Sequence, residues 1–196
     1  MNPVLHALRC VGSTSPARVA WFTGLSESDV ESDLIDLAVA GLVSYERAFG
    51  AWSLTETGRA RDAFDTSAEL DASGTRPALA AAFEDFLVLN PELLDLCTAW
   101  QIRSDGTVND HTDTAYDARV LALFADLHAR AVEVIAALAA AAPRFARYSL
   151  RLTSSLRRAQ AGELDRLADT MDSYHAIWAE LHEDLLATRG ITRWSG

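Results

Sequence analysis

The chain contains no lysine. All 17 of its basic residues are arginine, and with 28 acidic residues among 196 the formal net charge is −11. This acidic balance argues against non-specific attraction to phosphate, which supplies much of the affinity of ordinary DNA-binding proteins. The overall charge therefore points away from nucleic acid, and a DNA-binding function has to rest on other features.

Cysteine and long apolar runs are also scarce. Cys10 and Cys97 lie among apolar neighbours and form no CxxC pair, which predicts two small buried side chains and excludes a structural zinc site built on cysteine. No apolar run approaches the ~20 residues that span a bilayer. The first ten residues lack the apolar core of a signal peptide. We therefore expect a cytoplasmic protein with no membrane segment.

The common catalytic motifs are missing as well. The chain has no nucleophile elbow, no P-loop and no glycine-rich dinucleotide fingerprint, so we predict that the protein is not an enzyme. A general acid–base pair can still be written from His111, His175 or His182 with a nearby carboxylate. A helical enzyme or metal protein therefore remains an alternative.

Residues 1–70 have the pattern of three helices, a hairpin and a fourth helix. Apolar spacing and end signals predict helices over residues 3–11, 16–23, about 27–40 and about 56–70. Pro16 suits the first position of the second helix, and Ser26 or Ser28 suits the cap of the third. Two short strands around a turn near Phe49-Gly50 predict a β-hairpin.

Three motifs in this region stand at the spacing of a known family. They are Gly24-Leu25-Ser26, Gly41-Leu42-Val43 and Leu54-Thr55-Glu56-Thr57-Gly58-Arg59. Together they resemble the winged helix-turn-helix regulators of the multiple-antibiotic-resistance-regulator (MarR) type. The resemblance implies a winged helix over residues 1–70, with its third helix in the major groove. The side chains then expected at DNA are Arg18, Ser28, Ser32, Arg47, Arg59 and Arg61.

The third helix is acidic where such regulators meet base edges. It carries Glu27, Asp29, Glu31 and Asp33, and residues 1–62 hold five arginines against eight acids, a net charge of −3. Early carboxylates stabilise a helix dipole, and a carboxylate can accept a hydrogen bond from cytosine, so acids do not forbid readout of DNA. The alternative is an adaptor that does not bind DNA and whose acidic face docks a protein partner, such as a cationic one.

The rest of the chain is predicted to be helical. Residues 71–75 carry turn residues without an apolar period and read as a linker to a second domain over residues 76–190. Helices are predicted over 77–100, with a break or kink at Asn90-Pro91, and over 114–141, 143–160 and 164–188. Such helices with short connections are typical of an antiparallel bundle. The predicted fold class is therefore mainly α.

The helical half mixes aromatic and polar side chains around residues 100–117 and along the last helix. It resembles the C-terminal region of a group of actinobacterial proteins usually labelled regulators, through segments such as 109–113, Tyr116-Asp117 and 173–175. We predict a site for a small-molecule effector, with the residues Trp100, Arg103, His111, Tyr116, Tyr148, Arg151, Tyr174, His175, Trp178 and His182. The alternative is that these side chains form buried hydrogen-bond networks that lock the helices together.

The same residues offer little to a metal ion. His175 and His182 are seven residues apart, about 10.5 Å along a helix, which is too far to share one ion. Asp172/His175 and Asp113/Asp117 have a suitable spacing, but that spacing is generic. We predict no metal site and no cofactor. The function that we expect is that of a homodimeric, one-component transcriptional regulator, in which a helical domain senses a ligand or dimerises.

Overall fold

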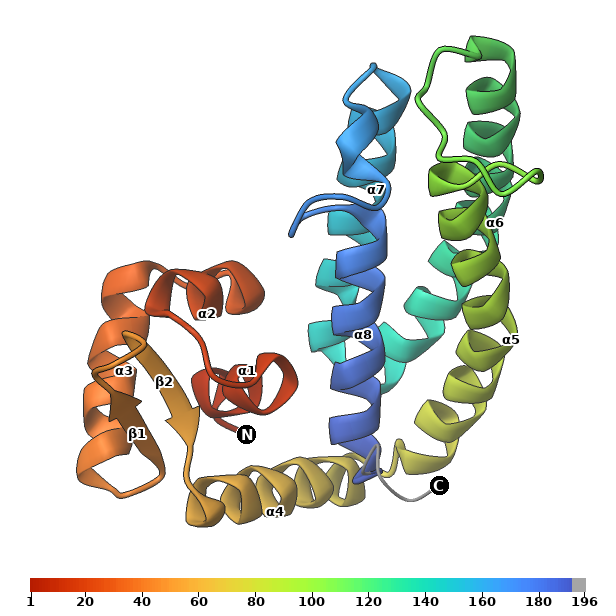
Figure 1. The fold of residues 1–196 in the computed structure, drawn as a ribbon. Helices are drawn as coiled ribbons and strands as arrows, with labels where there is room; N and C mark the ends of the chain where they lie inside the picture. Colours follow the sequence, from red (N-terminus) through yellow and green to blue (C-terminus); the bar gives the residue numbers. More distant parts are fainter. Residues whose placement is uncertain (192–196) are drawn as a thin grey trace. The chain divides into compact units, whose positions relative to one another are not determined.

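The computed structural model describes residues 1–191, which form a mainly helical protein with one two-stranded antiparallel sheet (Figure 1). This confirms the predicted mainly α fold class. The chain divides into two compact units. Unit 1 comprises Met1–Gly74 together with the segment from Glu183 onward, and unit 2 is Thr75–His182.

Unit 1 begins with three helices whose ends follow local capping rules. They are α1 (Pro3–Val11), α2 (Pro16–Thr23) and α3 (Glu27–Val39), and their N-caps are Asn2, Ser15 and Ser26. In each case the cap side chain accepts a hydrogen bond from a backbone N–H in the first turn, which satisfies one of the free donors at a helix start.

The hairpin follows α3 and leads into α4 (Glu56–Ser73). Strand β1 (Val43–Glu46) pairs with β2 (Ala51–Leu54), with Val43 opposite Leu54 and Tyr45 opposite Trp52. The backbone of Trp52 also exchanges two hydrogen bonds with Thr14, of 3.0 and 2.8 Å, which tie the hairpin to the segment between α1 and α2. The core of this part comprises Val4, Leu5, Ala7, Leu8, Val19, Phe22, Val30, Leu34, Leu37 and Val43.

Unit 2 contains α5 (Arg76–Gln101), α6 (Thr114–Ala141), α7 (Ala146–Gln160) and the first turns of α8 (Tyr174–Arg189). Short 3-10 helices, η1 (Pro143–Phe145) and η2 (Leu164–Arg166), stand before and after α7. Helices α5 and α6 lie side by side and run in opposite directions, joined by the loop 102–113 (Figure 1). Trp100, Phe124, Tyr148, Tyr174 and Trp178 are buried in this unit.

Three predicted boundaries differ from the structure. The segment 71–75 is not a linker for most of its length, because α4 continues to Ser73 and ends at Gly74, whose φ of 66° is the left-handed conformation that glycine adopts readily. Pro91 lies inside α5 without ending it. Leu89 and Leu93, on either side of Pro91, are both buried, and this packing offsets the hydrogen bond that proline cannot donate. The predicted helix 164–188 is two helices, since residues 167–173 between η2 and α8 are turns.

Candidate functional site

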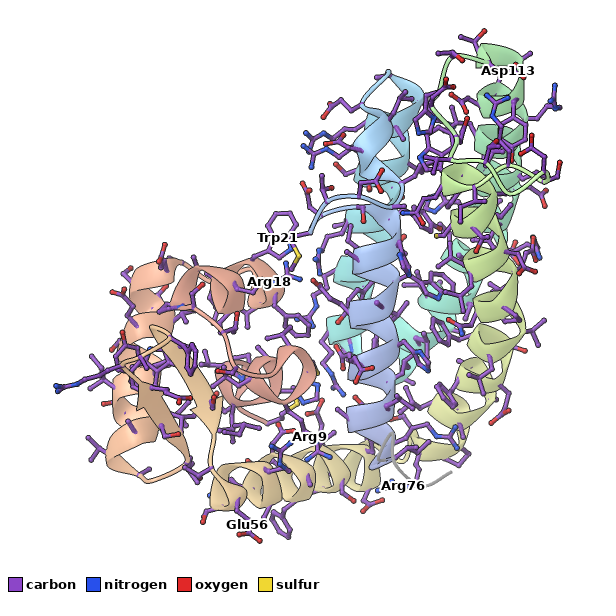
Figure 2. The ribbon with its side chains drawn as sticks, in the orientation of Figure 1. Arg9, Arg18, Trp21, Glu56, Arg76 and Asp113 are labelled. Carbon is purple, nitrogen blue, oxygen red and sulfur yellow. The ribbon has the colours of Figure 1, made fainter. Side chains whose placement is uncertain are left out.

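The residues expected at DNA lie on four elements of unit 1. Ser28 and Ser32 are exposed one turn apart on α3, and Arg47 is exposed in the hairpin turn. Arg59 and Arg61 are exposed at the start of α4, where Arg61 donates to Asp65 at 2.9 Å. Arg18 is half-buried on α2 (Figure 2). Of the six predicted residues, Ser28 and Ser32 share a helix face with acidic neighbours. Arg47 is the one basic residue of the hairpin.

A groove of about 400 Å³ lies between α3, the start of α2 and the hairpin. Glu27, Glu31 and Ile35 contribute one wall from successive turns of α3. Tyr45 and Trp52 contribute the other wall, with their ring centroids 5.0 Å apart. Both glutamates are exposed. The groove therefore combines aromatic faces with two carboxylates, an arrangement that suits a cationic group.

Four residues of the predicted effector site lie together at the loop that joins α5 to α6: Trp100, Arg103, His111 and Tyr116. The Trp100 and His111 ring centroids are 4.6 Å apart, and the Arg103 guanidinium stands over the Tyr116 ring at 5.3 Å. Tyr116 donates its hydroxyl to the carbonyl of Ala99 at 2.7 Å. These contacts join the end of α5 to the start of α6.

His111 is the strained residue of this group. Its φ of 57° makes it the single non-glycine residue with positive φ in the described chain. Its Nδ1 lies 3.0 Å from Oδ2 of Asp117, whose Oδ1 accepts from the Asn109 amide at 2.8 Å. Asn109 also donates to the carbonyl of Trp100 at 3.0 Å, and Arg103 donates to the Asn109 side chain at 3.2 Å. Because the Asp117 carboxylate only accepts, Nδ1 of His111 is the donor in this contact.

The charges beside His111 come from the ends of the loop. Arg103 lies 3.6 Å from Asp113 and 3.8 Å from Asp110. Asp113, which is labelled in Figure 2, is also the N-cap of α6 and accepts from the N–H of Tyr116 at 3.0 Å. The strain at His111 is therefore held by a network in which each polar partner is itself fixed, a pattern found at functional sites.

Tyr148, Arg151, Tyr174, Trp178 and His182 form a second group of predicted effector residues. Trp178 stacks on Phe86 with ring centroids 4.7 Å apart and donates to Asn90 at 3.0 Å. The His182 ring lies 5.3 Å from that of Phe86. Tyr148 is buried, and Arg151 pairs with Glu180 at 2.7 Å. These contacts join α5, α7 and α8 and match the alternative that the side chains lock the helices together.

His128, on α6, completes this second group, although it is not one of the predicted site residues. It lies 3.1 Å from the Tyr174 hydroxyl and 3.0 Å from the Thr153 hydroxyl. Burial lowers the pKa of His128, and the charge of Arg157 lowers it further. Burial also raises the pKa of Tyr174. Both groups are therefore neutral at pH 7. The last predicted residue, His175, is half-buried, and its backbone N–H donates to Leu167 at 3.0 Å.

A buried polar cluster in unit 1 was not predicted. His6 on α1 lies between two aspartates, with Nδ1 3.2 Å from both oxygens of Asp62 on α4 and Nε2 2.9 Å from Oδ1 of Asp184 on α8. The Cys10 sulfur lies 3.6 Å from Nε2. His6, Asp62 and Asp184 are at most 2 % exposed. Arg9 adds a positive charge 3.6 Å from Asp62.

The cluster perturbs its own titrating groups. Burial acts to lower the pKa of His6, but the electrostatic interaction with Cys10, the charge and hydrogen bond of Asp184 and the hydrogen bond to Asp62 outweigh it and raise the pKa well above 6.5. Burial raises the pKa of the Cys10 thiol. The sequence did contain one signal of this cluster, the i, i+4 spacing of His6 and Cys10, which puts both on one face of a helix. No local signal indicates that Asp62 and Asp184 join them.

A second groove lies in unit 2. It has a volume of about 440 Å³ and is lined by Val132, Ile135, Ala136, Ala139, Ala146, Ser149 and Leu150 from α6 and α7. None of the predicted effector residues lines it. Leu150 is 76 % exposed, so this groove presents apolar surface to its surroundings.

Comparison with known proteins identifies no relative of this chain. No protein-family model matches the chain, and neither the curated proteins nor the solved structures contain a match. Among residues 1–191, no helix combines the length and the apolar character needed to cross a bilayer.

Proposed function

We propose that residues 1–74 form a winged helix-turn-helix and that the protein is a DNA-binding transcriptional regulator. The observation that carries the proposal is the element order: α1, α2 and α3 are followed by a hairpin and then by α4, all within unit 1. Ser28 and Ser32 are exposed on α3, and Arg47 is exposed in the hairpin turn. In winged helices these two elements reach the major groove and the DNA backbone.

The acidic face limits how such a regulator binds. Glu27 and Glu31 stand on the exposed side of α3, so phosphate contacts must come from arginines outside α3, such as those of the hairpin and of α4. If Arg47 and Arg59 from both copies of a homodimer each contact one phosphate, four counterions are released and the slope of log affinity against log salt is about −3.6. Affinity then falls about 150-fold between about 50 and 200 mM salt.

Unit 2 is assigned the sensing or dimerising role in this proposal. The network around His111, with Arg103 and Trp100 beside it, supplies convergent polar and aromatic groups for a small effector. The apolar groove between α6 and α7 supplies surface for a second copy. An effector that favours one dimer geometry changes operator affinity by a coupling of about 1–3 kcal/mol.

The groove beside α3 favours a second function, that of an adaptor for a cationic protein segment. Glu27 and Glu31 lie one turn apart opposite Tyr45 and Trp52. An arginine or lysine side chain would meet two carboxylates and two aromatic faces there, whereas a phosphate would be repelled. This function uses the same surface as DNA binding, but it requires the negative charge of that surface, whereas DNA binding is weakened by it.

Fluorescence anisotropy separates the two functions. The DNA is a pool selected from random sequence by the full chain, and the cationic ligand is an arginine-rich peptide. A regulator shows sequence-selective binding with the salt slope given above, and the double variant Arg47→Ala, Arg59→Ala loses that slope. Arg130→Ala serves as a matched control, because this arginine lies on α6, where it pairs with Glu92. Absence of DNA binding at the lowest salt would overturn the proposal that the protein is a regulator.

The glutamates give the sharper comparison. In a regulator whose α3 approaches phosphate, Glu27→Gln with Glu31→Gln removes repulsion and strengthens non-specific DNA binding at low salt. In an adaptor, the same pair of substitutions abolishes binding of the arginine-rich peptide. One pair of substitutions therefore supports one function and counts against the other.

A further inference from the structure

The buried cluster on α1 has the composition of a metal site. His6 and Cys10 are four residues apart on α1, so their side chains share one face, and Asp184 reaches the same point from α8. One atom from each of the three side chains lies within 4.8 Å of the other two. All three residues belong to unit 1. The absence of a CxxC pair excludes a site built on cysteine pairs, but a mixed site needs only one thiolate.

The separations are close to those between ligands of one tetrahedral ion. With zinc bonds of about 2.0–2.1 Å to histidine nitrogen, about 2.3 Å to sulfur and about 2.0–2.2 Å to carboxylate oxygen, neighbouring ligand atoms stand roughly 3.3–3.6 Å apart. Nε2 of His6 lies 3.6 Å from the Cys10 sulfur and 2.9 Å from Oδ1 of Asp184. A widening of a few tenths of an ångström brings His6 and Asp184 into this range, and the Cys10 and Asp184 ligand atoms lie within 4.8 Å of each other.

The surroundings orient the ligands as in known metal sites. Asp62 lies 3.2 Å from Nδ1 of His6, on the side of the ring away from Cys10 and Asp184. A carboxylate at this place holds the proton on Nδ1 and leaves Nε2 as the ligand, an arrangement that recurs at zinc sites. Thr188 donates to Oδ1 of Asp184 at 3.2 Å, which fixes the third ligand.

We propose that His6, Cys10 and Asp184 bind one zinc ion, with Asp62 acting as a positioning residue for His6. The mixed nitrogen, sulfur and oxygen set favours zinc, because magnesium and calcium prefer oxygen ligands alone. Binding forms three bonds to the ion, and the protons of the Cys10 thiol and of His6 Nε2 pass to solvent. Three protein ligands leave a fourth position for water or a small ligand. The proposal is independent of the DNA-binding function.

Metal titration of the full chain, purified without a tag and stripped with a chelator, tests the site. Zinc is added in competition with a chromophoric chelator, and one ion per chain is expected. Cobalt(II) is used as a spectroscopic substitute, and a thiolate-to-cobalt charge-transfer band is expected with tetrahedral d–d bands. Cys10→Ser removes the charge-transfer band. Asp62→Asn lowers zinc affinity by about 10–100-fold and keeps the band.

The second cysteine supplies the matched control. Cys97 is buried on α5 in unit 2, so Cys97→Ser leaves zinc affinity and the cobalt spectrum unchanged. In this variant Cys10 is the only thiol, and stoichiometric zinc slows its reaction with a thiol reagent. This measurement needs no substitution in the cluster, so it holds even where Cys10→Ser does not fold. No stoichiometric zinc binding, or a charge-transfer band that survives in Cys10→Ser, would overturn the proposal.

Discussion

Gly58→Ala is expected to destabilise unit 1, although the position is helical. Gly58 lies in the first turn of α4, and a Cβ added there would stand 1.9 Å from the carbonyl oxygen of Leu42. That is about 1.5 Å short of the 3.4 Å at which ordinary contact begins. The obstacle is backbone and not the end of a flexible side chain, so the start of α4 must move away from Leu42 in the connection between α3 and β1.

The expected magnitude follows from what holds this contact in place. The Leu42 carbonyl accepts from the N–H of Thr55 at 3.1 Å, and the Thr55 hydroxyl donates to the carbonyl of Gly41 at 2.8 Å while capping α4. Relieving the clash stretches these bonds, and overpacking of this kind costs about 1–3 kcal/mol. At an ordinary helical site, replacing glycine with alanine stabilises by about 0.4–1 kcal/mol. The two expectations differ in sign.

Thermal and urea denaturation followed by circular dichroism provide the measurement. In a unit of 60–100 residues, each kcal/mol lowers Tm by about 4–8 °C. Thr57→Ala is the control, because Thr57 is an exposed neighbour on α4 and its substitution is expected to change stability by no more than about 0.5 kcal/mol. A Gly58→Ala variant as stable as the wild type would refute the close approach between α4 and Leu42.

Two further predictions concern unit 2. The pKa of His128 is lowered below 6.5 by burial and by the charge of Arg157. The unfolded chain therefore binds more protons than the folded chain at acidic pH. The contribution of neutral His128 to stability is complete above pH 6.5 and is lost as the pH falls through the folded-state pKa. Urea denaturation from about pH 7.5 to 5 should show this loss in the wild type and a flatter profile in His128→Gln, and equal profiles would contradict it. Asp117→Asn should cost about 1.5–3 kcal/mol, because buried Asp117 accepts from Asn109 and lies 3.0 Å from Nδ1 of His111. Exposed Asp126→Asn is the control, and an equal urea midpoint for the two variants would count against the His111 network.

Local signals predicted most element boundaries of unit 1. Pro16, Ser26 and Gly24 act within one turn of their own positions, so the start of α2, the cap of α3 and the end of α2 follow from the sequence. The end of α4 was misplaced, because polar residues 71–73 resemble a turn and only Gly74 ends the helix. Composition cannot distinguish a polar last helical turn from a polar loop where packing decides.

The two polar clusters also differ in how far they could be predicted from the sequence. Asn109, His111 and Asp117 lie within nine positions of one another, so their grouping around a loop was visible in the sequence, although the positive φ of His111 was not. The cluster on α1 joins positions 6, 62 and 184. No periodicity links such distant positions, and only the fold brings them together.

The two glutamates of α3 differ in what their charges contribute to the helix. Glu27 lies in the first turn, where a carboxylate stabilises the helix dipole by about 0.3–1 kcal/mol. Glu31 lies one turn later, outside the range of that effect, and no ion pair within residues 1–191 involves it. Its carboxylate lines the groove beside Tyr45 and Trp52. Under the proposed functions this charge acts on what the groove binds or repels, and Glu31→Gln is expected to change that surface at little cost in stability, because Glu31 is exposed.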